Sequence, residues 1–321
     1  MIRITRRALL LGASAISLAS HATRPLRAAD NVEILASLPN MAFPFFVHMM
    51  KAIHAEADKL GGVTIVESDG QGASPKQTAD VETALVRGVK GIVISPNEVD
   101  AMAPAISGAV EAGVPVVTID RRVENVEGIL AHVGADNVKG GEAQGELVMK
   151  LFPNGAKVMN LQGQPGASPA IDRNKGLHNI LDKAPDKYQF IFEQTANFAR
   201  DRGLAVTEAG LAGLAEPPDV IVAANDDMAL GAMEAVKARN LGDKIKIMGF
   251  DALPEALAAV RDGALTATIE QFPGGQSTQA VDILIDKVRN GKDPANKLIL
   301  LTPVAITKDN LDKAERLGEV T

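Results

Sequence analysis

Several apolar runs in this sequence of 321 residues end in side chains whose hydrogen-bonding groups are planar. These side chains are carboxylates, amides and a guanidinium: Asp120, Arg121, Asn225, Asp251 and Gln271. A carboxylate accepts hydrogen bonds, an arginine donates them and an amide does both, so the set is complementary to hydroxyl groups, which also do both. These residues therefore predict a site for a small molecule that is rich in hydroxyl groups.

Aromatic residues are scarce, and their positions point to the same site. The chain has no Trp, one Tyr and nine Phe. Six of the Phe flank the polar clusters or a loop expected beside them: Phe43, Phe45, Phe46, Phe198, Phe250 and Phe272. A flat ring offers an apolar face that can cover the C–H face of a sugar. Phe45 and Phe46 are equally consistent with core packing at the start of a helix.

Single residues of the polar set have a simpler interpretation as well. An Asp after a strand often caps the next helix, and Asp226 could cap a helix that starts at Met228. Arg122 is interpreted as a solvated neighbour of Arg121. The prediction of a site therefore rests on the whole constellation rather than on any one member.

Motifs for catalysis or for metals are missing from the sequence. The chain has no Cys, which excludes disulfides, thiolate zinc sites and thiol nucleophiles. It has neither a Walker A loop nor a G-x-S-x-G elbow. The histidines beyond residue 29 lack metal-ligand spacing: His48, His54, His132 and His178. We expect no catalytic residue, no metal and no cofactor.

The first 29 residues have the pattern of a signal peptide. Arg3, Arg6 and Arg7 precede an apolar stretch at 8–19, and small residues follow. The pair Arg6-Arg7 resembles a twin-arginine export signal. The apolar stretch is shorter than the roughly 20 residues that a membrane-spanning helix needs. An amphipathic N-terminal helix is the alternative. We expect cleavage after residue 22 or 29 and export to the periplasm.

The charge of the exported chain argues against polyanionic partners. Beyond residue 29 the sequence holds 28 basic and 40 acidic residues, a net charge of −12. Nucleic acids and anionic membranes are bound by basic surfaces, so neither is expected as a partner. The missing Cys also removes the usual lipid-attachment residue of exported lipoproteins. We therefore expect a soluble monomer without a lipid anchor.

Apolar runs of four to seven residues alternate with amphipathic stretches along the chain. The runs expected as strands are 32–37, 63–68, 91–95, 114–120, 156–162, 189–195, 220–224, 244–249 and 267–270. The expected helices are 45–60, 76–87, 101–112, 139–152, 172–183, 200–212, 228–238, 254–262 and 276–290. Such alternation predicts an α/β fold with parallel sheets. Because this is too many strands for one compact sheet, we expect two Rossmann-like lobes, with a boundary at the turn-like segment 132–136.

The order of these motifs resembles the periplasmic sugar-binding proteins of the ribose-binding type, over residues 32–311. The motifs that carry the resemblance are Pro44-Phe45-Phe46, Ile94-Ser95-Pro96, Thr118-Ile119-Asp120-Arg121, Asp136-Asn137-Val138-Lys139-Gly140-Gly141, Ala224-Asn225-Asp226-Asp227-Met228, Gly249-Phe250-Asp251 and Thr268-Ile269-Glu270-Gln271. Members of this family are substrate-binding subunits of ABC importers. The resemblance implies a type I periplasmic binding fold, with a three-crossing hinge between lobes 30–135 plus 272–302 and 136–271 plus 303–321.

The resemblance also implies roles for individual residues and partners. Phe45, Phe46 and Phe198 would stack on the ligand, and Gln271 would contact it at a hinge crossing. Asp120, Arg121, Asn225 and Asp251 would bind its hydroxyl groups. The implied ligand is a sugar or polyol, and the implied partner is an ABC permease with its ATPase. A periplasmic sensor that presents sugar to a receptor is the alternative function, and an exported sugar enzyme is a third.

Two departures from the family pattern bear on the ligand. The loop before Pro44 is about two residues longer, so Asn40 maps poorly onto the family's ligand-binding Asn, whose place Phe43 takes. The family's ligand-binding Arg falls on Ile171, and the nearest basic residue is Arg173. We retain both Asn40 and Arg173 as expected ligand contacts. Because Ile171 cannot donate a hydrogen bond, we expect weak ribose binding and a different monosaccharide or sugar alcohol as ligand.

Overall fold

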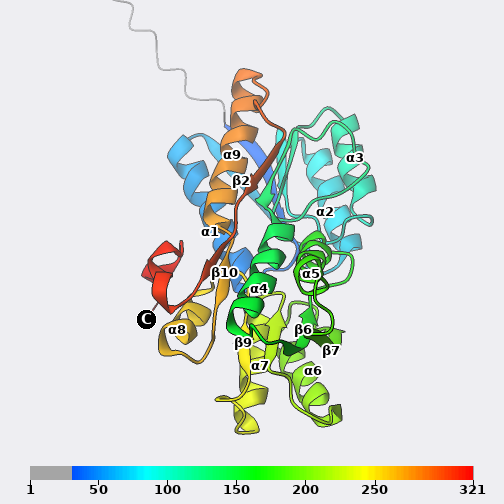
Figure 1. The fold of residues 1–321 in the computed structure, drawn as a ribbon. Helices are drawn as coiled ribbons and strands as arrows, with labels where there is room; N and C mark the ends of the chain where they lie inside the picture. The colour runs from blue at the N-terminus through cyan, green and yellow to red at the C-terminus, as the bar shows by residue number, and fades with distance from the viewer. Residues whose placement is uncertain (1–30, 321) are drawn as a thin grey trace, which may run out of the picture.

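The computed structural model describes residues 31–320, and the expected signal peptide at 1–29 lies outside them. Its first sheet is parallel and has the strand order β11-β5-β4-β3-β1-β2. The strands are β1 (Val32–Leu38), β2 (Val63–Asp69), β3 (Gly91–Ile94), β4 (Val116–Ile119), β5 (Ala131–Ala135) and β11 (Leu298–Leu301). This sheet lies in the upper half of the molecule in Figure 1.

Helices cover both faces of the first sheet because its strands are apolar on both sides. The helices are α1 (Pro44–Leu60), α2 (Ser74–Arg87), α3 (Ala103–Glu111) and α9 (Pro273–Asn290). Val93 of β3 belongs to the core shared with α1 and α9, whereas Ile92 and Ile94 belong to the core shared with α2 and α3. Successive side chains of a strand point to opposite faces, which accounts for this division.

The second sheet, in the lower half of Figure 1, is parallel with the order β7-β6-β8-β9. Its strands are β6 (Ala156–Gln162), β7 (Tyr188–Thr195), β8 (Val220–Ala223) and β9 (Lys246–Met248). The helices that accompany it are α4 (Asn137–Leu151), α5 (Ser168–Leu181), α6 (Arg200–Gly213), α7 (Asp226–Ala238) and α8 (Pro254–Asp262). One face packs on α4 and α5, and the other packs on α6 and α7.

The chain passes between the two sheets at three places. It leaves β5 for α4, returns from β10 (Thr268–Glu270) to α9, and leaves β11 for β12 (Val304–Ile306). Strands β10 and β12 pair antiparallel, and the Asp136 N–H donates to the carbonyl of Leu301 at 2.9 Å. Two 3₁₀ turns, Lys308–Lys313 and Leu317–Glu319, end the described chain. The crossings therefore lie side by side.

Every expected strand and helix is present, with ends that differ by a few residues, and the expected α/β class is confirmed. The expectation of a turn at 132–136 is wrong, because residues 131–135 form β5. Strands β11 and β12 were also not expected. The helix cap at the start of α7 is Asn225, whose side chain accepts from the Met228 N–H, so the alternative that assigned the cap to Asp226 is wrong.

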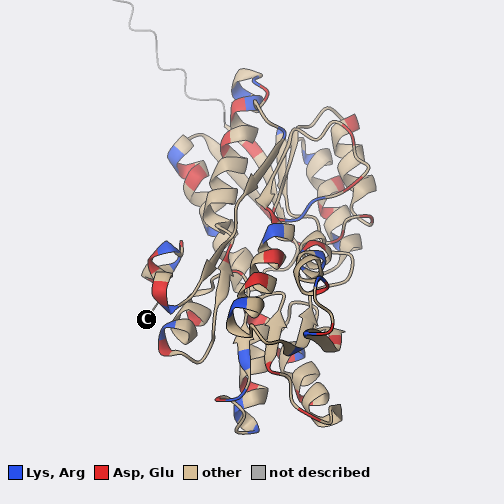
Figure 2. Ribbon diagram, viewed as in Figure 1, with Lys and Arg blue, Asp and Glu red and all other residues tan. Residues whose placement is uncertain are grey.

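Charges of both signs are interspersed along the helices in the view of Figure 2. No helix within residues 31–320 combines the length and apolar character needed to span a membrane.

Candidate ligand-binding site

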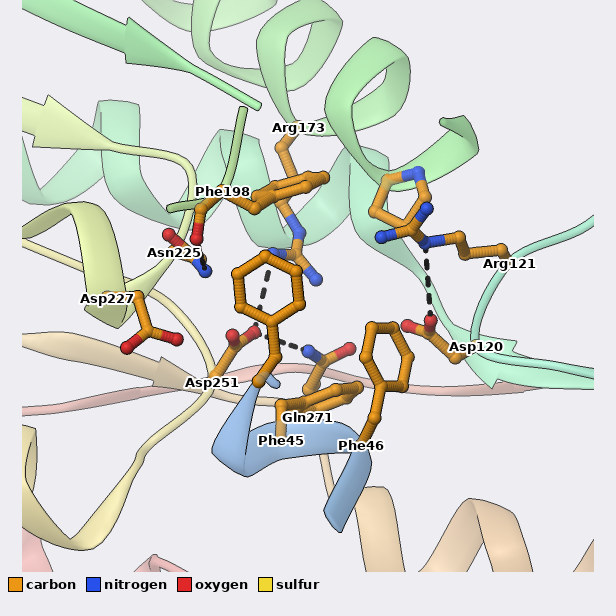
Figure 3. Close-up of a pocket in the computed structure, with 12 residues that line it drawn as sticks. Phe45, Phe46, Asp120, Arg121, Arg173, Phe198, Asn225, Asp227, Asp251 and Gln271 are labelled. Atoms are coloured by element: carbon orange, nitrogen blue, oxygen red, sulfur yellow. Dashed lines mark hydrogen bonds and ion pairs between the residues drawn. The ribbon is translucent and has the colours of Figure 1, made fainter. Parts of the chain in front are cut away.

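A cavity lies where the carboxyl ends of the two sheets face each other. Side chains from both sheets line it, as Figure 3 shows. They are Phe43, Phe45, Phe46, Asp120, Arg121, Pro169, Arg173, Phe198, Asn225, Asp227, Asp251 and Gln271. Ligands of open parallel sheets bind at this end of the strands, because the loops that leave the sheet there converge. The cavity is the candidate ligand-binding site.

Three phenylalanines form its apolar walls. Pro44 starts α1, which places Phe45 and Phe46 on the first turn with ring centroids 5.3 Å apart, edge to face. Phe198 lies on the other side, in a left-handed backbone conformation, and its carbonyl accepts from Asn225 Nδ2 at 3.0 Å. The guanidinium of Arg121 lies 5.4 Å from the Phe46 centroid and 5.6 Å from that of Phe198. All three rings are buried.

Asp120 and Arg121 follow β4 and are both buried. Asp120 Oδ2 accepts from the hydroxyl of Ser95 at 3.0 Å and lies 3.9 Å from Arg121 Nε. Arg121 Nη1 donates to the carbonyl of Asn97 at 2.8 Å and to Gln164 Oε1 at 3.2 Å. Burial raises the pKa of Asp120 and lowers that of Arg121 to about 10, and the opposite charge of each partner resists the shift.

Arg173, Asp251 and Gln271 form a second buried group. Arg173 Nη1 donates to the carbonyl of Ala224 at 2.7 Å and lies 3.4 Å from Asp251 Oδ1, while its guanidinium stacks 3.6 Å from the Phe250 centroid. Gln271 Nε2 donates to Asp251 Oδ1 at 2.6 Å. Burial raises the pKa of Asp251 to about 7, although Arg173 lowers it. The arrangement fixes the orientation of all three side chains around the cavity.

The expectation that Ile171 deprives the site of an arginine is wrong. Ile171 is 50% exposed and does not line the cavity, whereas Arg173 lines it and is 3% exposed. Because α5 begins at Ser168, the residues at helical spacing on its buried side are Ala170, Arg173 and Leu177. This periodicity is a sequence signal that could have placed Arg173 in the site. Because the site contains an arginine after all, Ile171 gives no reason to expect weak ribose binding.

Nine of the ten expected contacts line the cavity, and Asn40 does not. Asn40 lies in the longer loop before α1, where its side-chain oxygen accepts from the Ala42 N–H at 3.0 Å, and it lines a groove outside the cavity. Phe43, Pro169 and Asp227 line the cavity and were not among the expected contacts. Arg122, expected to be solvated, is half-buried and pairs with Asp172. Ligand contact by the nine residues stays a prediction.

The fold and the cavity together define a protein that encloses a small, hydroxyl-rich molecule between two parallel sheets. The model of the periplasmic binding protein domain family matches residues 34–293. The chain is 41% identical over 254 residues to the ribose import binding protein of Bacillus subtilis, covering 78% of this chain and 80% of the relative. It is 36% identical over 281 residues to that of Escherichia coli, covering 87% and 91%.

Among solved structures, the chain is similar to the Caulobacter myo-inositol binding protein bound to myo-inositol. The identity is 42%, the TM-score is 0.87, and the match covers 90% of this chain and 98% of that one. The chain therefore belongs to the periplasmic binding protein family, and within it to the ribose-binding type. Members of this family bind their ligands and are not enzymes.

Proposed function

We propose that this protein is the substrate-binding subunit of an ABC importer and works in the periplasm, where it delivers ligand to a permease and its ATPase. Relatives that match most of the chain are import binding proteins for ribose, and one covering 64% of the chain is an import binding protein for fructose. These names favour import over the sensor alternative. The chain acts as a monomer in this proposal, because one chain supplies the whole cavity.

The proposal includes a division of the chain into two closing lobes, 30–135 with 272–302 and 136–271 with 303–321. The supporting observation is that the chain passes between the two sheets near each of these boundaries. A ligand that contacts residues from both sides of the cavity stabilises the closed arrangement, because it makes all its contacts only there.

The ligand class that we propose is a cyclitol of the myo-inositol type. The observation that supports it is the presence of unpaired hydrogen-bond acceptors in the residues around the cavity. Within residues 31–320, two of the residues that line the cavity each have a buried side-chain atom without a partner, and both atoms are acceptors: Gln271 Oε1 and Asp227 Oδ2. The ligand must therefore bring donors. Every ring carbon of myo-inositol carries a hydroxyl group, whereas the ring oxygen of a pyranose can only accept.

The energetic cost of a poor match supports the same choice. A buried acceptor left without a donor costs about 1–3 kcal/mol. A site in which two acceptors lack donors therefore selects against a ligand whose groups at those places can only accept. The similarity to the myo-inositol-bound Caulobacter protein, at 42% identity, is a second and independent support.

Calorimetric titration of ligand-free protein with myo-inositol, D-ribose and xylitol tests the proposal. We expect myo-inositol to bind most tightly. At about 100 times its dissociation constant it should add about 2.7 kcal/mol to the free energy of unfolding, which a thermal melt detects. Tighter binding of D-ribose than of myo-inositol would show that the ligand class is wrong.

A further inference from the structure

We propose that Asp227 is a ligand-binding residue that selects a fully hydroxylated six-membered ring over a pentose. This inference rests on the proposed function and assigns one part of its specificity to a single carboxylate. Asp227 lies in the first turn of α7, two residues after the capping residue Asn225. It lies between the cavity and the outer groove, lines both, and is 8% exposed.

The hydrogen bonding of Asp227 points to a ligand rather than to the fold. Within residues 31–320 its Oδ2 atom is buried without a hydrogen-bond partner. The adjacent Asp226 is fully engaged, because its oxygens accept from Thr268 Oγ1 at 2.7 Å and from the Leu253 N–H at 2.8 Å. Asp226 therefore holds α7 to the segment around β10, whereas Asp227 keeps an oxygen that no protein group hydrogen-bonds.

A negative charge on Asp227 is costly without a hydrogen-bond partner. Burial raises its pKa, Arg200 lowers it and Glu255 raises it, which together put the pKa at about 6. The start of a helix also favours a negative charge, because the first backbone N–H groups point toward it. A hydroxyl group that donates to the Asp227 carboxylate would supply the partner that the protein does not, and charge-assisted bonds of this kind are the stronger ones.

The position of Asp227 explains why it would distinguish ligands by size and substitution. In Figure 3 it lies at the opposite end of the cavity from Asp120 and Arg121. A ring with a hydroxyl on every carbon can donate to Asp120 at one end and to Asp227 at the other. A pentose has fewer hydroxyl groups, so one that is held at Asp120 and Asp251 leaves Asp227 without a donor.

Calorimetry on the full chain with two variants tests this inference. Asp227→Ala removes the acceptor, and Asp227→Asn keeps the shape but not the charge. We expect the dissociation constant for myo-inositol to rise tenfold or more in Asp227→Ala and less in Asp227→Asn. For D-ribose we expect a change below threefold. Glu234→Gln is the matched control, because it removes an acid from the same helix that also lies near Arg200 and lines the outer groove, but that does not line the cavity.

The outcomes separate this inference from the proposed function. Wild-type affinity for myo-inositol in both variants, with Glu234→Gln also unchanged, would overturn the role of Asp227 alone. An equal loss for myo-inositol and D-ribose would overturn its role in selection. If the wild type itself binds no cyclitol, the proposed ligand class fails first, and that result is read from the wild type without any variant. Circular dichroism melts of each variant establish that it is folded.

Discussion

The site depends on buried carboxylates whose negative charges are only partly balanced by hydrogen bonds and nearby cations. Burial raises the pKa of Asp251 to about 7 and that of Asp227 to about 6, and it also raises the pKa values of Asp120, Asp226 and Glu270. The ordinary value for an aspartate is near 4. These carboxylates therefore bind protons in the folded chain at a pH where the unfolded chain has released them.

This shift predicts opposite effects of pH on stability and on ligand affinity. As pH falls from 8 to 5, Asp251 and Asp227 take up protons in the folded protein that they do not take up in the unfolded chain, which stabilises the ligand-free protein. His132, whose pKa burial lowers to about 4, acts in the opposite direction over the same range, and the two carboxylates together outweigh it. A ligand hydroxyl stabilises the ionised carboxylates, so affinity falls over the same range. Thermal melts with and without myo-inositol should show a ligand-induced rise in Tm that shrinks toward pH 5. A rise that stays constant with pH would contradict the assignment of these carboxylates to the ligand.

Residue types at strand ends located most of the site before the structure was known, and the reason is geometric. Parallel strands bring their carboxyl ends to one edge, so Asp120, Asn225, Asp251 and Gln271 had to converge. Sequence could not tell Asp226 from Asp227, because two adjacent residues of one type differ only in the direction that the helix gives them. Asn40 was misplaced because a longer loop changes the path of the chain before α1.

At the scale of elements, glycines set how closely α4 and α5 approach. A Cβ at Gly141 of α4 would lie 2.1 Å from the Arg173 carbonyl, and one at Gly176 of α5 would lie 2.1 Å from the Val138 carbonyl. Both distances are far inside van der Waals contact. The close packing of these two helices therefore positions the arginine of the site.

Gly141→Ala should consequently weaken both the fold and the site. Overpacking of this kind costs about 1–3 kcal/mol of stability. We also expect weaker ligand binding, because α5 must shift and carries Arg173 with it. Melting and calorimetry measure the two effects. Gly108→Ala in α3 is the control: a Cβ there meets nothing within 4 Å, so we expect unchanged or higher stability and normal affinity. Normal affinity in Gly141→Ala would show that α5 does not transmit the change.

The missed strands show where sequence patterns lose their information. β5 contains His132 and Gly134 within five residues, which weakens the apolar signal and resembles a turn. β11 is an edge strand that alternates between exposed and half-buried residues, and β12 has only three residues. Their pairing depends on partners far along the chain, namely β5 for β11 and β10 for β12. Whether these segments form strands is therefore decided by pairing with distant segments and not by the local sequence pattern.

At the scale of the whole molecule, direct contacts join the first-sheet side to the second-sheet side. The Val99 N–H donates to the Gly166 carbonyl at 2.9 Å, and the Arg122 N–H donates to Ser168 Oγ at 3.0 Å. The side chain of Arg122 also forms an ion pair with Asp172. One member of each contact belongs to the first-sheet side and the other to the second. Because they join the two sides, we propose that they belong to a closed form and break when the lobes open.

The Arg122–Asp172 pair should therefore shift the balance between open and closed forms without touching the ligand. Arg122→Ala removes a half-buried pair worth up to about 1 kcal/mol, so affinity for myo-inositol should fall about two- to fivefold.

Small-angle scattering of the wild type should show a smaller radius of gyration with saturating ligand. In Arg122→Ala the ligand-free protein should be more expanded than the wild type, and the two should coincide when saturated. Arg87→Ala breaks an ion pair with Glu33 on the first-sheet side alone and should change neither quantity. If Arg122→Ala and Arg87→Ala have the same affinity and radius of gyration, or if ligand leaves the radius of gyration of the wild type unchanged, the contacts between the two sides do not govern closure.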